Sequence, residues 1–179
     1  RAVWREGVRD PEKMGTLPQA LRARLAAETV PSATKVVEAR ESDDGTVKAL
    51  LALADGRRVE TVLIPEGDRA TVCVSTQVGC PIGCVFCASG VGGVVRDLTA
   101  AEIAEQVLVM RERLGKRPSH VVVMGMGEPL LNLVNLVTAI RIWTDTEGMG
   151  FSPRRITVST AGTPSKIDRL AETGLDVTL

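Results

Sequence analysis

Three cysteines, Cys80, Cys84 and Cys87, lie within eight residues of a glycine-bounded stretch, and this spacing constrains the chain more than any other feature. A fourth cysteine, Cys73, lies seven residues upstream, and the sequence contains no other. Thiolates concentrated in one loop are typical of a metal site. Three cysteine ligands on a four-iron cluster leave one iron without a protein ligand, free to bind a small molecule. The spacing therefore predicts a [4Fe-4S] cluster.

Other interpretations of these cysteines stay open on the residues alone. Structural zinc takes four ligands, commonly as two pairs, but no second pair exists, and His120, the only histidine, lies in an apolar run typical of a packed strand. A redox dithiol at Cys84 and Cys87 has the right two-residue gap but leaves Cys80 unexplained. Inert core cysteines are not expected in a loop bounded by glycine. The iron–sulfur interpretation is favoured.

Composition narrows the class of protein. Basic and acidic residues balance at 22 each, so net charge offers no argument for nucleic acid as a partner. No apolar run reaches transmembrane length, no signal peptide opens the chain, and four cysteines do not resemble a secreted disulfide framework. We therefore expect a cytoplasmic protein that does not contact a membrane. Because the chain begins at Arg1 and ends inside an apolar run, we expect it to be a piece of a longer protein.

Residues 1–67 predict a small α+β accessory domain. Thr16 followed by Pro18 is typical of a helix start, and a four-residue leucine spacing supplies an apolar stripe. The leucines of this stripe are Leu17, Leu21 and Leu25. Segments rich in Val, Leu and Thr, separated by Asp-Gly turns, then predict a three-stranded antiparallel meander over 34–40, 46–53 and 58–64. A turn over 65–68 is the expected domain boundary.

Residues 68–179 alternate between strand and helix patterns. Strands are predicted over 70–75, 120–124, 155–159 and 176–179, and helices after the capping box Thr99–Glu102, around Trp143, and from Thr163 to Gly174. Repeated βα units give a parallel sheet or barrel whose sites form at the carboxyl ends of the strands. We therefore expect the cysteine loop and the loops 125–129 and 159–162 to converge on one rim.

The motif Cys80-x-x-x-Cys84-x-Phe86-Cys87 resembles the signature of the radical S-adenosylmethionine (SAM) superfamily. MGMGEPLLN (124–132) and ATVCVSTQVGC (70–80) together resemble the dual-specificity RNA methyltransferases that place a methyl group on C2 of adenine in 23S rRNA and tRNA. The resemblance extends to VETVLIP (59–65) and RITVST (155–160), along almost the whole chain. It implies an α/β fold: the first half of a partial radical-SAM (βα) barrel at 68–179, preceded by the accessory domain.

The resemblance also implies the cofactor site. The three cysteines of the loop would hold the [4Fe-4S] cluster, and its open iron would bind S-adenosyl-L-methionine, which yields a 5′-deoxyadenosyl radical on reduction. Gly127 and Glu128 would bind the methionyl end of SAM, Ser159 would contact its nucleoside, and Phe86 would pack beside its adenine.

Two further residues gain roles only through this resemblance. Adenine C2 is not nucleophilic, so the family uses one SAM to methylate a carrier cysteine near its C-terminus and a second SAM to activate that methyl group. Glu60 matches the proton acceptor; without the resemblance, a strand carboxylate is expected to be solvated. Cys73 matches the cysteine that resolves the protein–RNA adduct through a disulfide with the carrier; otherwise it would be a small strand residue.

The chain departs from the family's pattern because no cysteine follows Cys87, so the carrier is absent and the 179 residues alone are not expected to methylate RNA. The expected partners are 23S rRNA, tRNA and an electron donor such as a flavodoxin, and the expected state is a monomer. Three alternatives remain: the C8-methylating relative of the antibiotic-resistance type, a radical SAM enzyme with a non-RNA substrate, and a non-catalytic metal-containing RNA-binding module.

Overall fold

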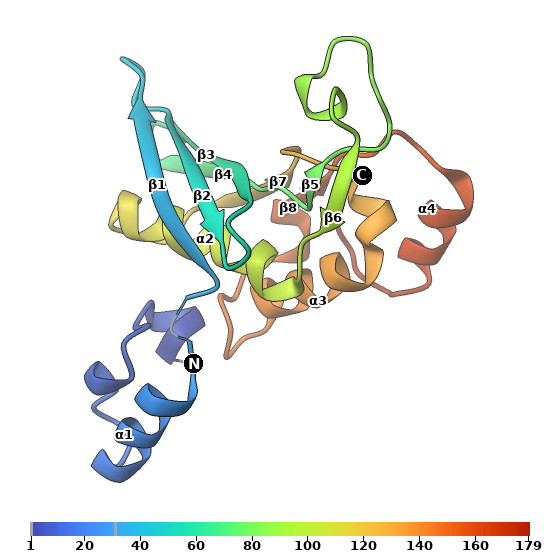
Figure 1. The fold of residues 1–179 in the computed structure, drawn as a ribbon. Helices are drawn as coiled ribbons and strands as arrows, with labels where there is room; N and C mark the ends of the chain where they lie inside the picture. Colours follow the sequence, from blue (N-terminus) through green and yellow to red (C-terminus); the bar gives the residue numbers. More distant parts are fainter. Residues whose placement is uncertain (1, 31) are drawn as a thin grey trace.

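A computed structural model describes residues 2–30 and 32–179 and shows one six-stranded sheet in the order β1-β2-β3-β4-β7-β8 (Figure 1). The first four strands pair antiparallel and the last three pair parallel, which gives the expected mixed α/β architecture. The strands are β1 (Thr34–Glu41), β2 (Val47–Leu53), β3 (Arg58–Glu66), β4 (Arg69–Cys73), β7 (His120–Val123) and β8 (Ile156–Val158). The predicted meander and the strand that begins at His120 are confirmed.

The sheet is continuous across the expected domain boundary. β3 extends through Pro65 and Glu66, which the sequence had suggested as part of a turn, and β4 begins at Arg69. Only Gly67 and Asp68 make the turn, and Gly67 has φ +56, a left-handed conformation that glycine adopts without strain. The turn is shorter than the expected 65–68 because Glu66 pairs with Arg69, so that β3 has a partner strand up to its end. The division at residues 67 and 68 stays a prediction.

The first helix differs from its prediction. α1 spans Gln19–Glu28 and is capped by Pro18 with no side-chain hydrogen bond, so Thr16 does not cap it. None of its residues is buried, and Leu21 is 41% exposed, so the expected apolar stripe is not buried in a core. The reason is visible in Figure 1, where α1 lies apart from the sheet while other helices cover the sheet's face.

Two helices form the core with one face of the sheet. α2 (Ala100–Leu114) begins with the predicted capping box between Thr99 and Glu102, and α3 (Leu133–Thr144) carries the fully buried Trp143. Alternate strand residues, such as Val59, Val72 and Val121, belong to the same buried cluster as these helices. The residues between them on β3 and β4 are half-buried on the opposite face. That opposite face carries the candidate site.

A hairpin that the sequence patterns did not predict brackets the cysteine loop. β5 (Gln77–Gly79) pairs antiparallel with β6 (Val94–Asp97), and the intervening loop rises above the sheet (Figure 1). Both strands are too short to show an alternating pattern, which is why periodicity missed them.

The C-terminal elements are short. α4 spans Pro164–Ala171, so the helix ends before Gly174, and Glu172 caps it. The strand expected over 176–179 is reduced to one parallel bridge between Thr157 and Thr178. Two backbone hydrogen bonds form it: the N–H of Val158 donates to the carbonyl of Thr178, and the N–H of Thr178 donates to the carbonyl of Ile156. The single-turn elements are η1 (Ala2–Glu6), η2 (Pro11–Lys13), η3 (Ala88–Gly90), η4 (Pro129–Asn132) and η5 (Pro153–Arg155). Within the described residues, no helix has the length and apolarity needed to cross a membrane.

Candidate active site

The register of the sheet brings Glu60 and Cys73 to one face. Cys73 pairs with Val62, and Glu60 lies two residues before Val62, so the side chains of all three point to the same side. They line a cavity of about 230 Å³ with Ser75, with Ser89 of the cysteine loop, and with residues 124–126 of the loop after β7. Two residues expected to act on one substrate are therefore brought together.

Glu60 and Cys73 differ in their surroundings. One carboxylate oxygen of Glu60 lies 3.0 Å from Nζ of Lys48, and both side chains are about half exposed. Burial raises the pKa of the Cys73 thiol, an effect that the backbone N–H of Met124 only partly opposes. Cys73 is thus kept mainly as a thiol at neutral pH, while Glu60 faces solvent and a cation.

A test of Cys73 follows from this raised pKa. In protein without cofactors, we expect the rate of alkylation of Cys73 by iodoacetamide to rise with pH, with a midpoint above that of a free cysteine, because only the thiolate reacts and burial disfavours it. Mass spectrometry of the peptide that contains Cys73 would follow the reaction from pH 6 to 10, and a free-cysteine peptide would serve as reference. A midpoint at or below that of the reference would contradict the expectation.

The cysteine loop is closed by glycines at its base and at its tip. A Cβ at Gly79 would lie 2.0 Å from the carbonyl oxygen of Gly93, and one at Gly90 would lie 2.9 Å from Cα of Gly83. The two sides of the loop can therefore touch only without side chains at these positions. The N–H of Cys87 donates to the carbonyl of Cys84 at 2.9 Å, which forms a tight turn between two of the thiols. Phe86 is 90% exposed, so its expected contact with adenine stays a prediction.

The cysteine loop carries the type of ligand atoms that an iron–sulfur cluster needs, but its thiols are not gathered around one point. All four cysteines are free and half-buried. Among residues 2–30 and 32–179, however, no group of three His, Cys, Asp or Glu side chains is gathered closely enough to hold a metal ion. Three thiols on one short loop, with no histidine nearby in sequence, remain the ligand chemistry that iron–sulfur clusters use. The assignment of Cys80, Cys84 and Cys87 as ligands therefore stays a prediction based on donor type.

Glu128 joins the loops that follow β7 and β8. Its side chain is buried, with 4% exposure; Oε1 accepts from the N–H of Leu130 at 3.0 Å and from Oγ1 of Thr160 at 2.7 Å. Oε2 accepts from the N–H of Ala161 at 2.7 Å. Both oxygens are thus engaged within the chain. Ser159, directly before Thr160, is exposed, and its N–H donates to Val123 at 3.2 Å.

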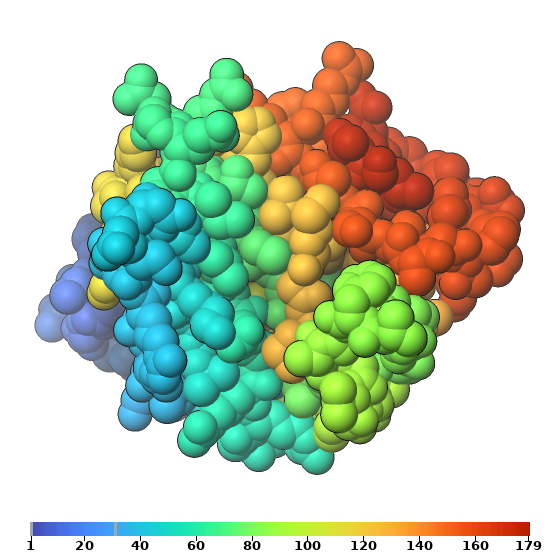
Figure 2. Space-filling view, turned by 90° about the horizontal axis from the view of Figure 1, so that it is seen from above, coloured from blue at the N-terminus to red at the C-terminus, as the bar shows by residue number. Residues whose placement is uncertain are grey.

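The expected convergence of three loops is therefore present. Seen from above, the yellow-green cysteine loop lies beside the gold segment after β7 and close to the orange segment after β8 (Figure 2). Gly127 has φ +104, and a Cβ there would lie 2.7 Å from Cβ of Gln77, so its loop packs closely on β5. Gly127, Glu128 and Ser159 share this rim with the cysteine loop, and their contacts with SAM stay predictions.

Three residues of the site escaped sequence reasoning: Ser75, Gln77 and Gln106. Ser75 donates through Oγ to the carbonyl of Glu60 at 2.6 Å and accepts from the N–H of Met126 at 2.9 Å. The fully buried amide of Gln106 binds both backbone groups of Ser75, at 2.8 and 2.9 Å. For Ser75 and Gln77, the available signal was their position in a polar run directly after an apolar strand, because most buried polar side chains are hydrogen-bonded. No comparable signal marked Gln106 on α2.

Comparison with protein families decides the class of this site. The model of the radical SAM superfamily matches residues 74–178, which is more than half of the chain. The chain belongs to the radical SAM superfamily. Membership implies a [4Fe-4S] cluster, as the cysteine spacing predicted, and S-adenosylmethionine, as the motif resemblance implied.

Individual relatives agree with this membership. The chain is 49% identical over 180 residues to a probable dual-specificity RNA methyltransferase RlmN of Thermus thermophilus. The matched region covers 99% of this chain and 51% of the relative. It is 50% identical over 184 residues to the dual-specificity RNA methyltransferase RlmN of Nitratidesulfovibrio vulgaris, with 97% and 50% coverage. The chain therefore spans about half the length of the curated relatives that it matches. The family resemblance read from the motifs is confirmed.

A solved structure gives the same result for the fold. The crystal structure of a radical SAM methyltransferase from Sphaerobacter thermophilus superposes with a TM-score of 0.93 at 43% identity, over 98% of this chain and 53% of that one. The α/β fold expected from the sequence is confirmed.

Proposed function

We propose that the protein to which this chain belongs is a radical SAM methyltransferase that places a methyl group on C2 of adenine in 23S rRNA and tRNA. The observation that carries this proposal is the shared cavity of Glu60 and Cys73, next to Ser89 of the cysteine loop. An acid–base residue, a thiol and the cofactor loop thus meet in one place. Relatives about half identical over nearly the whole chain bear the name of this activity, which supports the proposal.

Each residue has a defined task in this proposal. Cys80, Cys84 and Cys87 hold the [4Fe-4S] cluster, while Gly127, Glu128 and Ser159 orient SAM on the rim. Bound cluster and SAM together supply a 5′-deoxyadenosyl radical. Glu60 accepts the proton lost from adenine C2 when the new carbon–carbon bond is made. The thiolate of Cys73 would attack the sulfur of a carrier cysteine outside this chain, so that an S–S bond forms and the bond between that sulfur and the transferred carbon breaks. The freed carbon would take up a proton to become the methyl group of the released RNA, and the one surplus electron of the radical adduct would return to the redox partner.

The proposal extends to partners and location. We expect residues 1–67 to help to hold the RNA, a flavodoxin-type protein to deliver the electron, and the enzyme to act as a monomer. Free, half-buried thiols on an exposed loop are compatible with a reducing cytoplasm, where we place the enzyme.

Replacement Glu60→Gln tests the proposal. We expect the rate of RNA methylation to fall about 10²- to 10⁴-fold, because the amide keeps the shape of Glu60 but cannot accept a proton. The measurement is liquid chromatography and mass spectrometry of adenosines from 23S rRNA and tRNA incubated with the whole protein, SAM and a reductant. Replacement Glu38→Gln serves as the matched control, since Glu38 is an exposed carboxylate on β1, two strands away from β3 in the same sheet, and lies outside the cavity with Cys73.

The same assay separates the alternatives. Methylation at C8 instead of C2 would assign the protein to the resistance-type relative. SAM cleavage with no methylated adenine would favour a non-RNA substrate, and no SAM cleavage on reduction would favour a binding module. Full activity of the Glu60→Gln variant would remove Glu60 from the reaction.

A further inference from the structure

The side chain of Gln77 connects the cysteine loop to the loop that carries Glu128. Gln77 lies on β5, three residues before Cys80, and is 3% exposed. Its Nε2 donates to Oδ1 of Asp97 on β6 at 2.7 Å, and its Oε1 accepts from the N–H of Glu128 at 2.8 Å. One buried amide thus ties both strands at the base of the cysteine loop to a residue on a separate loop.

The Glu128 loop also packs on the backbone of β5. The carbonyl of Met126 accepts from the N–H groups of Thr76 at 2.8 Å and Gln77 at 3.2 Å. Gly127 permits this contact, since a Cβ there would lie 2.7 Å from Cβ of Gln77 and 2.8 Å from its backbone nitrogen. The two loops are therefore in direct contact, and Gln77 is the residue of β5 whose side chain accepts a hydrogen bond across that contact, alongside the bond from Met126 to Ser75 just before the strand.

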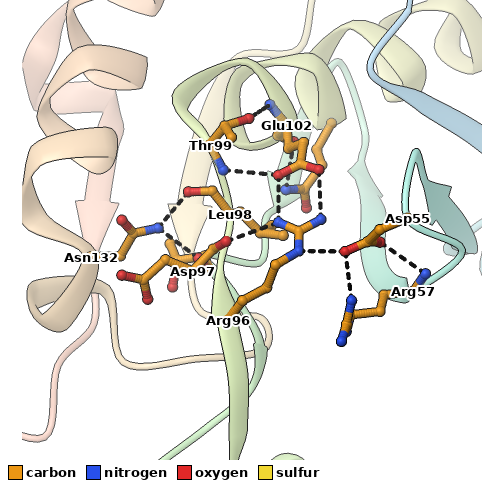
Figure 3. A network of polar contacts seen from close by, with 10 residues as sticks. Asp55, Arg57, Arg96, Asp97, Leu98, Thr99, Glu102 and Asn132 are labelled. Carbon is orange, nitrogen blue, oxygen red and sulfur yellow. Dashed lines mark hydrogen bonds and ion pairs between the residues drawn. The ribbon is translucent and has the colours of Figure 1, made fainter.

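Both ends of this connection are themselves anchored. Arg96, next to Asp97 on β6, binds the two carboxylate oxygens of Glu102 at 2.9 Å and Oδ2 of Asp55 at 2.7 Å (Figure 3). The base of the cysteine loop is thereby attached to α2 and to the β2–β3 turn. At the other end, Glu128 holds Thr160 and Ala161, as described above. Gln77 lies between two fixed parts of the molecule.

We propose that Gln77 is a positioning residue that sets the place of the cysteine loop relative to the Gly127–Glu128 loop, and so the fit of SAM between them. The proposal rests on the proposed function in one respect, the assignment of the methionyl end of SAM to Gly127 and Glu128. A carboxamide suits this task because it is both donor and acceptor, and each of its halves has a single partner here. A carboxylate at position 77 could accept from Glu128 but could not donate to Asp97.

A pair of substitutions tests this coupling. Gln77→Glu buries a charge against the carboxylate of Asp97, whereas Asp97→Asn alone keeps an oxygen acceptor for Gln77 and serves as control. The double variant Gln77→Glu/Asp97→Asn restores a donor and acceptor pair with the roles exchanged and the net charge unchanged. We measure SAM affinity of the reconstituted whole protein, the change in its electron paramagnetic resonance spectrum on SAM addition, iron content, and amide hydrogen exchange of residues 124–130 without SAM.

We expect Gln77→Glu to weaken SAM binding about tenfold or more and to speed exchange in residues 124–130, with iron content retained. The double variant and Asp97→Asn should bind SAM within about threefold of the unmodified protein. Unchanged SAM affinity or exchange in Gln77→Glu would overturn the proposal, as would a double variant that recovers neither. If Gln77→Glu fails to fold, Gln77→Met decides by the same two measurements, because it removes both side-chain hydrogen bonds without burying a charge. The measurements of SAM binding and hydrogen exchange use no RNA. An absence of methylated adenine in the separate RNA assay would therefore overturn the proposed function but not the inference about Gln77.

Discussion

Replacement of Cys84 by serine is expected to leave the protein with almost no bound iron or sulfide after anaerobic reconstitution. A serine hydroxyl is not ionised at neutral pH and cannot replace a thiolate ligand, and two remaining cysteines do not hold a four-iron cluster. The turn itself should persist, because the hydrogen bond from Cys87 goes to the backbone carbonyl of residue 84. Colorimetric iron and sulfide content and the visible absorption of the cluster measure the effect.

Cys73→Ser is the matched control for this experiment. Cys73 lies on β4 in the cavity with Glu60, outside the cysteine loop, so we expect this variant to keep the iron content of the unmodified protein. Loss of iron in Cys73→Ser, or full iron in Cys84→Ser, would contradict the division of the four cysteines into three ligands and one reactive thiol. One zinc ion per chain in the unmodified protein would contradict the iron–sulfur assignment itself.

Replacement of Gly127 by alanine is expected to lower the free energy of unfolding by about 2–4 kcal/mol and to abolish measurable SAM binding. The backbone has φ +104, and the new Cβ would lie within 2.8 Å of Gln77 and of Oγ1 of Thr76. Relief of this overlap requires the loop to move away from β5, which removes the N–H of Glu128 from Gln77. Denaturant unfolding and SAM titration measure the two effects.

Gly174→Ala separates strain of the backbone from this overlap. Gly174 also has a positive φ, of +70, but a Cβ there would meet nothing within 4 Å. We expect it to cost about 1 kcal/mol and to leave SAM binding unchanged. Equal effects of both substitutions would show that backbone strain alone, rather than the contact with β5, accounts for the loss at Gly127.

Sequence predictions were correct where the signal lies in nearby residues and wrong where the outcome depends on contacts with distant parts of the chain. The capping box at Thr99 depends on neighbours within a few residues, and the strand that begins at His120 was marked by a continuous apolar run; both were located correctly. The cap of α1 was predicted wrongly, and the apolar stripe of this helix is not covered, because leucine spacing indicates which face is apolar but not whether another element packs on it. The strand expected over 176–179 was reduced to one bridge for a similar reason, since pairing depends on its neighbour.

From the chain alone, the cysteine spacing predicted the iron–sulfur cluster and the βα order predicted the fold class. The superfamily and SAM were implied by the resemblance of the motifs at 80–87 and 124–132 to known families. Which of these residues meet depends on how the strands and loops pack together. The register of β3 with β4 places Glu60 beside Cys73, and the packing of α2 and the Glu128 loop buries Ser75, Gln77 and Gln106 as hydrogen-bonded links. The physical reason is that register and buried polar pairing depend on all strands and loops at once, whereas spacing along the chain reports only local geometry.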